Sequence, residues 1–264
     1  MPSRTEKYDS LRTRLASYPG ALVAFSAGVD STMLLAACVE VLGAARVRAV
    51  TAVSASYPGA ENAEGEEIAA LLGVERVLLD THEMDVEGYR KNGMDRCYYC
   101  KSELFDRMRK AVELSELPDW PILYGAILDD LSDYRPGAKA ASEAGVLAPL
   151  QEEGWSKEEV RKWSRERKLP TADKGSFACL SSRIPTGTAI DAALLLRVER
   201  AEEWFRRRGF HQFRVRHHGE LARIEVLPDE IPRLLGKEGK SLVTALQALG
   251  WKRVCVDLEG FRSS

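Results

Sequence analysis

The chain has 264 residues, 45% of them hydrophobic and 30% charged, so it can bury a full core in one large or two modest domains. Its net charge of −2 excludes an overall basic field that would attract nucleic acid. No apolar run approaches the roughly 20 residues of a membrane span, and the start, MPSRTEKYDSLRTRL, is too polar for a secretory signal. We expect a soluble, cytoplasmic protein whose five cysteines are thiols or metal ligands rather than disulfides.

The first part of the chain alternates strands with helices. The expected helices are residues 4–17, 30–42, 60–73, 98–114 and 156–168, and the expected strands are residues 21–25, 46–54, 75–81 and 121–127. Ser156 is a favourable N-cap for the last of these helices, and Cys38 lies on an apolar helix face. The alternation predicts an α/β fold with a parallel sheet covered on both faces.

The pattern changes after about residue 168. Residues 172–188, ADKGSFACLSSRIPTGT, are rich in Gly, Ser, Thr and Pro and predict a loop or linker. Beyond it we expect helices at 191–209 and 229–250 and strands at 212–218, 221–227 and 252–261. The sequence therefore predicts an N-terminal α/β domain of residues 1–172, followed by a linker and a small α+β domain within residues 173–264.

Residues 23–37, VAFSAGVDSTMLLAA, join a buried strand to an apolar helix through small and hydroxyl residues. Such a turn points several backbone N–H groups at one spot, where the helix dipole adds partial positive charge, so that an anion fits. Ser26 and Ser31 can donate hydroxyl groups, Gly28 permits close backbone approach, and Asp30 can cap the helix or face a metal. On these residues alone, an ordinary strand–helix turn is an equal alternative.

The order Ser-x-Gly-x-Asp-Ser after a strand resembles the pyrophosphate loop, SGGxDS, of the PP-loop ATP pyrophosphatases, which have a Rossmann-like domain. The resemblance implies that ATP is split between its α and β phosphates to adenylate a substrate oxygen. The residues it implies for ATP are Ser26, Ala27, Gly28, Val29, Asp30 and Ser31. Ala27 replaces the usual first glycine, which costs little if its φ is negative.

The negative charge of the ATP phosphates requires cations near this loop. We expect Mg²⁺, with Asp30 as its main protein ligand and Asp129 or Asp130 as further candidates. Lys101 is a candidate cation for the phosphates, and its alternative is a solvated lysine.

Four further segments, residues 125–150, 177–187, 213–226 and 257–263, resemble the LarE family, and the combination of DYRPG, SSR and RVR is specific. That family makes the sulfur-bearing precursor of the nickel-pincer nucleotide cofactor. The resemblance implies adenylation of both carboxylates of pyridinium-3,5-biscarboxylic acid mononucleotide, followed by their conversion to thiocarboxylates. It also implies a sulfide donor and a homo-oligomer. The charge balance and the absence of a long apolar run predict neither a nucleic acid nor a membrane as partner.

A dianionic mononucleotide needs cations, and Arg214 and Arg216 lie two residues apart on one face of a predicted strand. A solvated strand face is the alternative on these residues alone. The resemblance to the LarE family implies that the substrate is bound by Ser182, Arg183, Glu202, Arg214, Arg216, Glu225 and Arg262, with Arg223 as a further candidate.

Cys97 and Cys100 form a CxxC pair, and Cys179 lies in the linker. The residues alone leave open a redox dithiol, a zinc site, an iron–sulfur site and unrelated thiols. LarE-like proteins come in two kinds: one sacrifices the sulfur of a single cysteine, and the other holds a [4Fe-4S] cluster with three cysteines. The sacrificial position falls on Ala178, so we expect the cluster type, with Cys179 both ligand and catalytic residue beside Asp30, Ser31 and Lys101.

Three other functions remain as alternatives. The nearest is an iron–sulfur-dependent PP-loop tRNA thiolase, which the slightly acidic charge and the lack of an evident RNA-binding module disfavour. A non-catalytic metal-binding nucleotide sensor belongs to a different class. An ammonia-using amide synthetase would leave the three cysteines unexplained.

Overall fold

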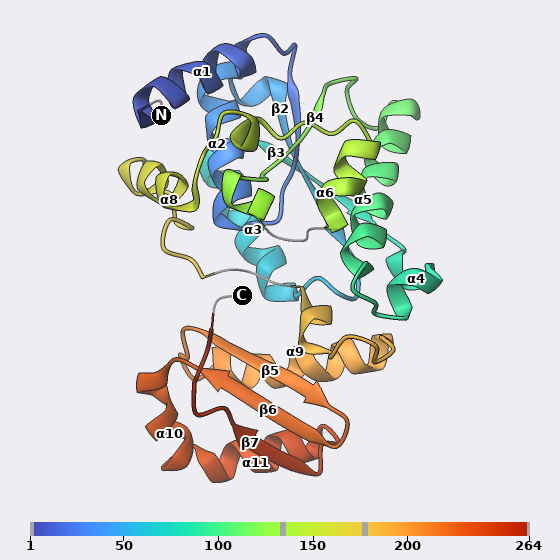
Figure 1. Cartoon of the computed structure of the whole chain (residues 1–264), viewed down its shortest axis with the longest axis vertical. Coiled ribbons are helices and arrows are strands. Elements are labelled where there is room, and N and C mark those ends of the chain that lie inside the picture. The colour runs from blue at the N-terminus through green and yellow to red at the C-terminus, as the bar shows by residue number, and fades with distance from the viewer. Residues whose placement is uncertain (1–2, 133–135, 176–178, 263–264) are drawn as a thin grey trace. The chain divides into compact units, whose positions relative to one another are not determined.

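The computed structural model describes residues 3–132, 136–175 and 179–262 (Figure 1). The chain divides into two compact units, one of Met1–Tyr89 with Met94–Lys174 and the other of Arg90–Gly93 with Gly175–Ser264. A search of the described helices finds none that combines the length and apolar character needed to cross a membrane.

The first unit contains a four-stranded sheet in the order β3-β2-β1-β4 with every pair parallel. Its strands are β1 (Ala21–Ala24), β2 (Val47–Val53), β3 (Glu75–Asp80) and β4 (Ile122–Tyr124). The predicted parallel α/β sheet is therefore confirmed. Because the chain proceeds outward from β1 to β3 and then returns to the other side of β1 as β4, the switch point lies between β1 and β4. In open parallel sheets, ligands bind at the carboxyl ends of the strands at such a point.

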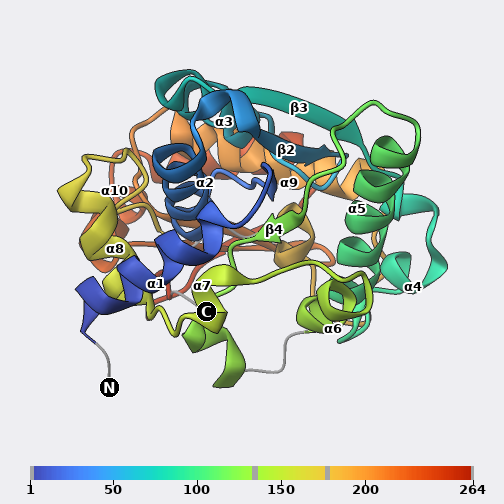
Figure 2. The ribbon, with the colours of Figure 1, turned by 90° about the horizontal axis from the view of Figure 1, so that it is seen from above.

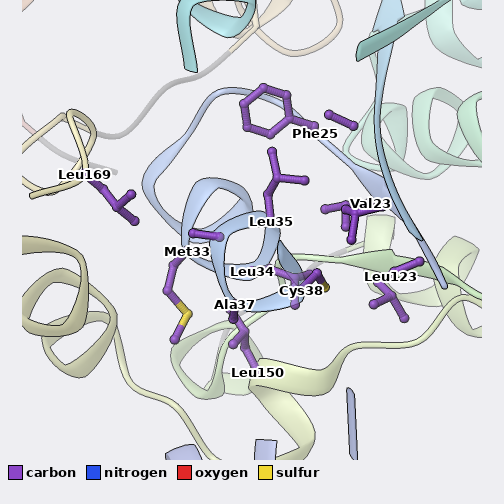
Figure 3. Close-up of a cluster of buried hydrophobic side chains, with 14 of the residues drawn as sticks. Val23, Phe25, Met33, Leu34, Leu35, Ala37, Cys38, Leu123, Leu150 and Leu169 are labelled. Carbon is purple, nitrogen blue, oxygen red and sulfur yellow. The ribbon is translucent and has the colours of Figure 1, made fainter. Parts of the chain in front are cut away.

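Helices cover both faces of this sheet (Figure 2). The helices of residues 4–166 are α1 (Arg4–Ala16), α2 (Val29–Leu42), α3 (Gly59–Leu72), α4 (Glu87–Arg90), α5 (Arg96–Glu113), α6 (Pro136–Glu143), α7 (Pro149–Glu152) and α8 (Lys157–Glu166). Successive residues of a strand point to opposite faces. Val23 accordingly packs in a cluster with α1, α2 and α8, whereas Leu22 packs with Phe105 of α5. Cys38 is fully buried in the first cluster, as predicted (Figure 3).

The second unit contains a smaller mixed sheet in the order β5-β6-β7. Strands β5 (Phe213–His218) and β6 (Leu221–Val226) are antiparallel, whereas β6 and β7 (Arg253–Val256) are parallel. The helices are α9 (Ala192–Arg206), α10 (Ile231–Leu235) and α11 (Gly239–Ala248). The predicted small α+β domain is confirmed as a fold class.

The single helix expected at residues 229–250 is wrong. Helix α10 ends at Leu235, and α11 begins at Gly239. Gly236 has φ −109° and ψ −115°, outside the helical region. A Cβ on Gly239 would lie 2.3 Å from the carbonyl oxygen of Leu234, so the chain can fold back this tightly only because residue 239 has no side chain.

Residues 90–93 come from the first half of the chain but belong to the second unit. The fully buried Asn92 donates from Nδ2 to the carbonyl oxygens of Pro185 at 2.9 Å and Thr188 at 3.0 Å. Its own carbonyl oxygen accepts a hydrogen bond from the Gly187 N–H at 2.8 Å. One buried amide thus fixes this segment to the loop that follows η4 (Leu180–Arg183).

The second unit should lose stability in mild acid because of His217. This buried imidazole accepts a hydrogen bond at Nδ1 from Trp251 Nε1 at 3.2 Å. Burial, with smaller contributions from Arg197 and His218, lowers its pKa below the ordinary 6.5. The stabilisation is therefore complete above pH 6.5 and is lost as pH falls through the lowered pKa of His217, by at most about 1.4 kcal/mol per pH unit.

Urea unfolding at about pH 7 and about pH 5 measures this effect. His217→Gln should reduce the loss of stability between the two pH values, whereas His211→Gln, at an exposed histidine, should retain it. An unchanged pH dependence in His217→Gln would contradict the assignment.

Candidate functional site

The first candidate site is the loop between β1 and α2, at the switch point of the parallel sheet. The N-cap of α2 is Gly28, and no described side chain caps this helix. The N–H groups of its first turn therefore remain available to an anion, and the helix dipole favours negative charge at the same place. The structure thus places the predicted pyrophosphate loop where a phosphate can be bound.

The two predicted hydroxyl groups of this loop lie side by side. Ser31 Oγ is 3.2 Å from Ser26 Oγ and donates to the Gly28 carbonyl oxygen at 3.1 Å. Ser31 Oγ also accepts a hydrogen bond from the Ser26 N–H at 3.3 Å. The buried side chain of Ser31 therefore connects the beginning of the loop at Ser26 with the N-cap of α2 at Gly28.

Ala27 has φ +56°, so the condition under which alanine costs little at this position, a negative φ, is not met. A side chain in the left-handed region costs about 1–2 kcal/mol. The methyl group of Ala27 is fully buried in the core, and its carbonyl oxygen accepts a hydrogen bond from Lys174 Nζ at 3.1 Å. Lys174 also forms ion pairs with Glu61 at 2.5 Å and Glu64 at 2.7 Å. Core packing and a lysine from the end of the unit therefore hold the strained residue.

Asp30, the second residue of α2, has one engaged and one unengaged carboxylate oxygen. Its Oδ2 accepts a hydrogen bond from Lys157 Nζ at 2.6 Å, whereas its buried Oδ1 has no partner among the described residues. Burial raises the pKa of Asp30, and the ammonium group of Lys157 opposes that rise. Mg²⁺ prefers carboxylate oxygen as a ligand, so a buried acceptor without a partner fits the predicted metal ligand.

Two further carboxylates lie near Asp30, on the 3₁₀ helix η3 (Leu128–Ser132) that follows β4. Asp129 Oδ2 accepts a hydrogen bond from the backbone N–H of Lys157 at 2.9 Å. Asp130 Oδ2 accepts one from the Ile127 N–H at 3.0 Å, and its charge contributes to the raised pKa of Asp30. Lys157 thus links Asp129, through its backbone N–H, to Asp30, through its ammonium group, and the Mg²⁺ site stays a prediction.

The thiols and Lys101 lie elsewhere. Cys97 and Cys100 are three residues apart at the start of α5, which places them on one side of that helix. The next residue, Lys101, packs against α6, where a Cβ on Gly137 would lie 3.0 Å from Lys101 Cγ. No hydrogen bond or ion pair among the described residues links Lys101 to residues 26–31.

Cys179 belongs to the second unit, where it precedes η4; Ala178 lies outside the described residues. Within the described part of either unit, no group of three or more His, Cys, Asp or Glu residues could hold a metal ion. Burial raises the pKa of the Cys38 thiol and, to a smaller extent, that of Cys255, so neither favours the thiolate form that binds metals. No disulfide joins the described cysteines.

The second candidate site is built around a buried ion pair. Arg183 donates to Glu202 from Nε at 2.8 Å and from Nη2 at 3.1 Å, and both side chains are buried. Arg183 Nη1 also donates to Ser182 Oγ at 2.9 Å. Glu202 Oε1 accepts a further hydrogen bond from the Val215 N–H at 3.0 Å. This bidentate pair connects η4, α9 and β5.

Arg214 and Arg216 extend this cluster along β5. Arg216 donates to Glu225 at 2.5 Å and to the carbonyl oxygen of Ser182 at 3.0 Å. Arg214 is 2% exposed, donates to the Arg262 carbonyl oxygen at 3.4 Å, and has no described partner for Nη2. Burial, with Arg183 and Arg216, lowers its pKa.

Arg223 pairs with Glu225 and with Asp257, and Asp257 pairs with Arg262. Through these pairs the seven predicted substrate residues and Arg223 belong to one connected cluster. A buried guanidinium with an unengaged N–H group is suited to an anion. Ser182, the first residue of this cluster in the chain, follows Cys179 by three residues. One short segment therefore carries both a thiol and part of the candidate anion site.

Two basic residues of the first site were missed from the sequence. Lys157 pairs with Asp30, and Lys174 holds Ala27. A signal existed only for Lys157, because a cation in the first turn of a helix opposes the helix dipole and so suggests another partner.

Comparison with known proteins finds full-length relatives, although no family model matches the chain. Over 265 residues it is 34% identical to the pyridinium-3,5-bisthiocarboxylic acid mononucleotide synthase of Lactiplantibacillus plantarum, covering 100% of this chain and 94% of that protein. It is 41% identical over 258 residues to an uncharacterised protein of Synechocystis sp., with 97% and 95% covered. An uncharacterised protein of Methanocaldococcus jannaschii is 25% identical over 242 residues, with 92% and 90% covered.

The buried pair of the second site gives a matched test. Glu202→Gln should lower the free energy of unfolding by about 3 kcal/mol, because it leaves the buried guanidinium of Arg183 without a compensating charge. The neighbouring Glu203→Gln changes an exposed pair with Arg207 and should cost less than about 0.5 kcal/mol. Urea denaturation of both variants measures the difference, and equal losses would show that the Arg183–Glu202 charge pair is not needed for the fold.

Proposed function

This chain belongs to the LarE family, the family of the Lactiplantibacillus plantarum pyridinium-3,5-bisthiocarboxylic acid mononucleotide synthase, and from that premise we propose that it is an ATP-dependent sulfurtransferase. Its substrate is pyridinium-3,5-biscarboxylic acid mononucleotide, and its product carries thiocarboxylates in place of both carboxylates. We further propose that it acts in the cytoplasm as a homo-oligomer.

The chemistry explains why ATP is needed. A carboxylate is a poor electrophile, since its own negative charge repels a nucleophile. Attack of a carboxylate oxygen on the α-phosphorus of ATP breaks the bond to the β-phosphate oxygen, and pyrophosphate leaves with the electron pair. Sulfide then attacks the acyl carbon of the adenylate, and AMP leaves as the carbon–oxygen bond breaks. The second carboxylate reacts in the same way with a second ATP.

The start of α2 is the observation that carries the ATP part of this proposal. The N–H groups of the first turn and the hydroxyl groups of Ser26 and Ser31 bind the phosphates. Asp30, whose buried Oδ1 has no described partner, would hold Mg²⁺ with Asp129 as a second candidate. When bound, Mg²⁺ offsets the negative charge of the phosphates.

The arginine cluster supports the substrate part. Arg214 and Arg216 bind the phosphate of the mononucleotide, and Arg214 offers its unengaged buried N–H group. Glu202 and Glu225 hold the guanidinium groups of Arg183 and Arg216 in place and limit the repulsion between the arginines. Ser182 donates its hydroxyl group to the same substrate.

Cys97, Cys100 and Cys179 are the proposed ligands of a [4Fe-4S] cluster. Thiolates are the usual ligands of such clusters, and each of these three side chains is at least partly exposed. When bound, such a cluster would supply an iron at which sulfide could bind.

Loss of the Ser31 hydroxyl should slow adenylation. Ser31→Ala removes the group that closes the loop, and pyrophosphate release from ATP should fall about 10²–10³-fold. Thr32→Val is the matched control, because the buried Thr32 hydroxyl has no described partner and should be dispensable. A colorimetric pyrophosphate assay with the dicarboxylate substrate measures both variants. Unchanged release in Ser31→Ala would contradict the assigned loop.

Replacing any one of Cys97, Cys100 or Cys179 by Ala should remove most of the iron from anaerobically purified protein, because two cysteines hold the cube poorly. Cys38→Ala and Cys255→Ala should retain it, since burial disfavours their thiolates. Iron analysis and the visible absorption spectrum are the measurements. Stoichiometric zinc, or dehydroalanine at Cys179 after turnover, would overturn the cluster assignment.

A further inference from the structure

We propose that Lys157 is a phosphate-binding catalytic residue of the adenylation step, held by Asp30 until a nucleotide binds. The inference rests on the proposed function and adds to it a cation that the loop motif does not include. It starts from the ion pair between Lys157 Nζ and Asp30 Oδ2, which are 2.6 Å apart.

The backbone of Lys157 is held by a hydrogen bond, whereas its side chain is partly exposed to solvent. Its backbone N–H donates to Asp129 Oδ2 at 2.9 Å. The side chains of Lys157 and Asp30 are 34% and 25% exposed, so a ligand arriving at the start of α2 can reach both. A lysine side chain has a flexible stem with three rotatable donors, so Nζ can leave Asp30 for a phosphate oxygen while the backbone stays in place.

Helix α8 itself does not account for this lysine. Lys157 is the first residue of the helix, where the dipole disfavours a positive charge. The first turn is already stabilised by a complete capping box between Ser156 and Glu159. A partly exposed ion pair also contributes little to stability. The placement of a cation here is therefore better explained by a ligand than by the helix.

The other described cations near the loop are engaged differently. Lys174 Nζ is bound by two carboxylates and by the carbonyl oxygen of Ala27. The guanidinium of Arg161 donates to the carbonyl oxygens of Ala172 and Lys174, both at 2.8 Å. Both stabilise the chain around the loop. Lys157, in contrast, is paired with the carboxylate that the proposed function assigns to the metal.

This pairing implies an exchange of partners. On nucleotide binding, Lys157 leaves Asp30 for an oxygen of the phosphate chain, and Asp30 would then be free to hold the Mg²⁺ that the proposed function requires. As the bond between the α-phosphorus and the β-phosphate oxygen breaks, negative charge grows on the departing pyrophosphate. The ammonium group stabilises that charge and transfers no proton.

Calorimetry with α,β-methylene-ATP and with AMP, each in the presence of Mg²⁺, tests the inference. Lys157→Met should weaken binding of α,β-methylene-ATP about 10- to 100-fold, the effect of losing a charge-assisted hydrogen bond. Binding of AMP should change less than about 2-fold, since AMP lacks the β and γ phosphates that the ammonium group contacts. Lys157→Arg should restore part of the affinity because it keeps the charge.

Lys162→Met is the matched control, because Lys162 is an exposed lysine of the same helix, and it should bind both nucleotides as the natural chain does. Equal affinity of Lys157→Met and the natural chain for α,β-methylene-ATP would overturn the inference and leave the proposed function intact. Equal loss of affinity for both nucleotides would show a structural role and would also overturn it. Failure of the natural chain to bind α,β-methylene-ATP would instead overturn the proposed function, and the inference with it.

Discussion

The close approach of Gly125 to the first turn of α2 is the constraint on which the first site depends. A Cβ on residue 125 would lie 2.8 Å from Ser31 N and 2.9 Å from the carbonyl carbon of Asp30, contacts that a folded chain does not tolerate. Because residue 125 is glycine, the chain leaving β4 passes directly against the start of α2. Asp129 and Asp130 then follow within five residues, and Asp129 accepts a hydrogen bond from the backbone N–H of Lys157, the residue whose ammonium group pairs with Asp30.

Both sites hold charges of one sign close together and compensate them with partners from distant parts of the chain. In the first, Lys157 lies 127 positions from Asp30. In the second, Glu202 and Glu225 separate the charges of Arg183 and Arg216. The two sites differ in which buried polar atom has no hydrogen-bond partner among the described residues. The first site leaves an acceptor, Asp30 Oδ1, and the second leaves a donor, Arg214 Nη2. Since a buried polar atom without a partner is costly, the first site favours a cation and the second an anion.

The sequence predicts those parts of this arrangement that depend on neighbouring residues. Alternation of apolar and polar positions placed the parallel strands and most helices, and Ser156 marked the start of α8, because these signals act within one or two turns of the chain. The φ of Ala27 has no such signal, and the lysine in the first turn of α8 indicates a partner without identifying it as Asp30, since both features depend on packing between remote segments. The break between α10 and α11 was missed because the apolar periodicity of residues 229–250 continues through Gly236.

Asn92 shows how one side chain can assign a short segment to a unit that is remote in sequence. Asn92 belongs to the second unit, and its buried amide donates to the carbonyl oxygens of Ile184 at 3.3 Å, Pro185 at 2.9 Å and Thr188 at 3.0 Å. The carbonyl oxygen of Arg90 accepts a further hydrogen bond from the Ile190 N–H at 2.9 Å. Since a buried polar group without a partner is costly, residues 90–93 bury their polar groups only together with the loop that follows η4. Four residues from the first half of the chain therefore fold with the second unit, and no pattern of neighbouring residues predicts this.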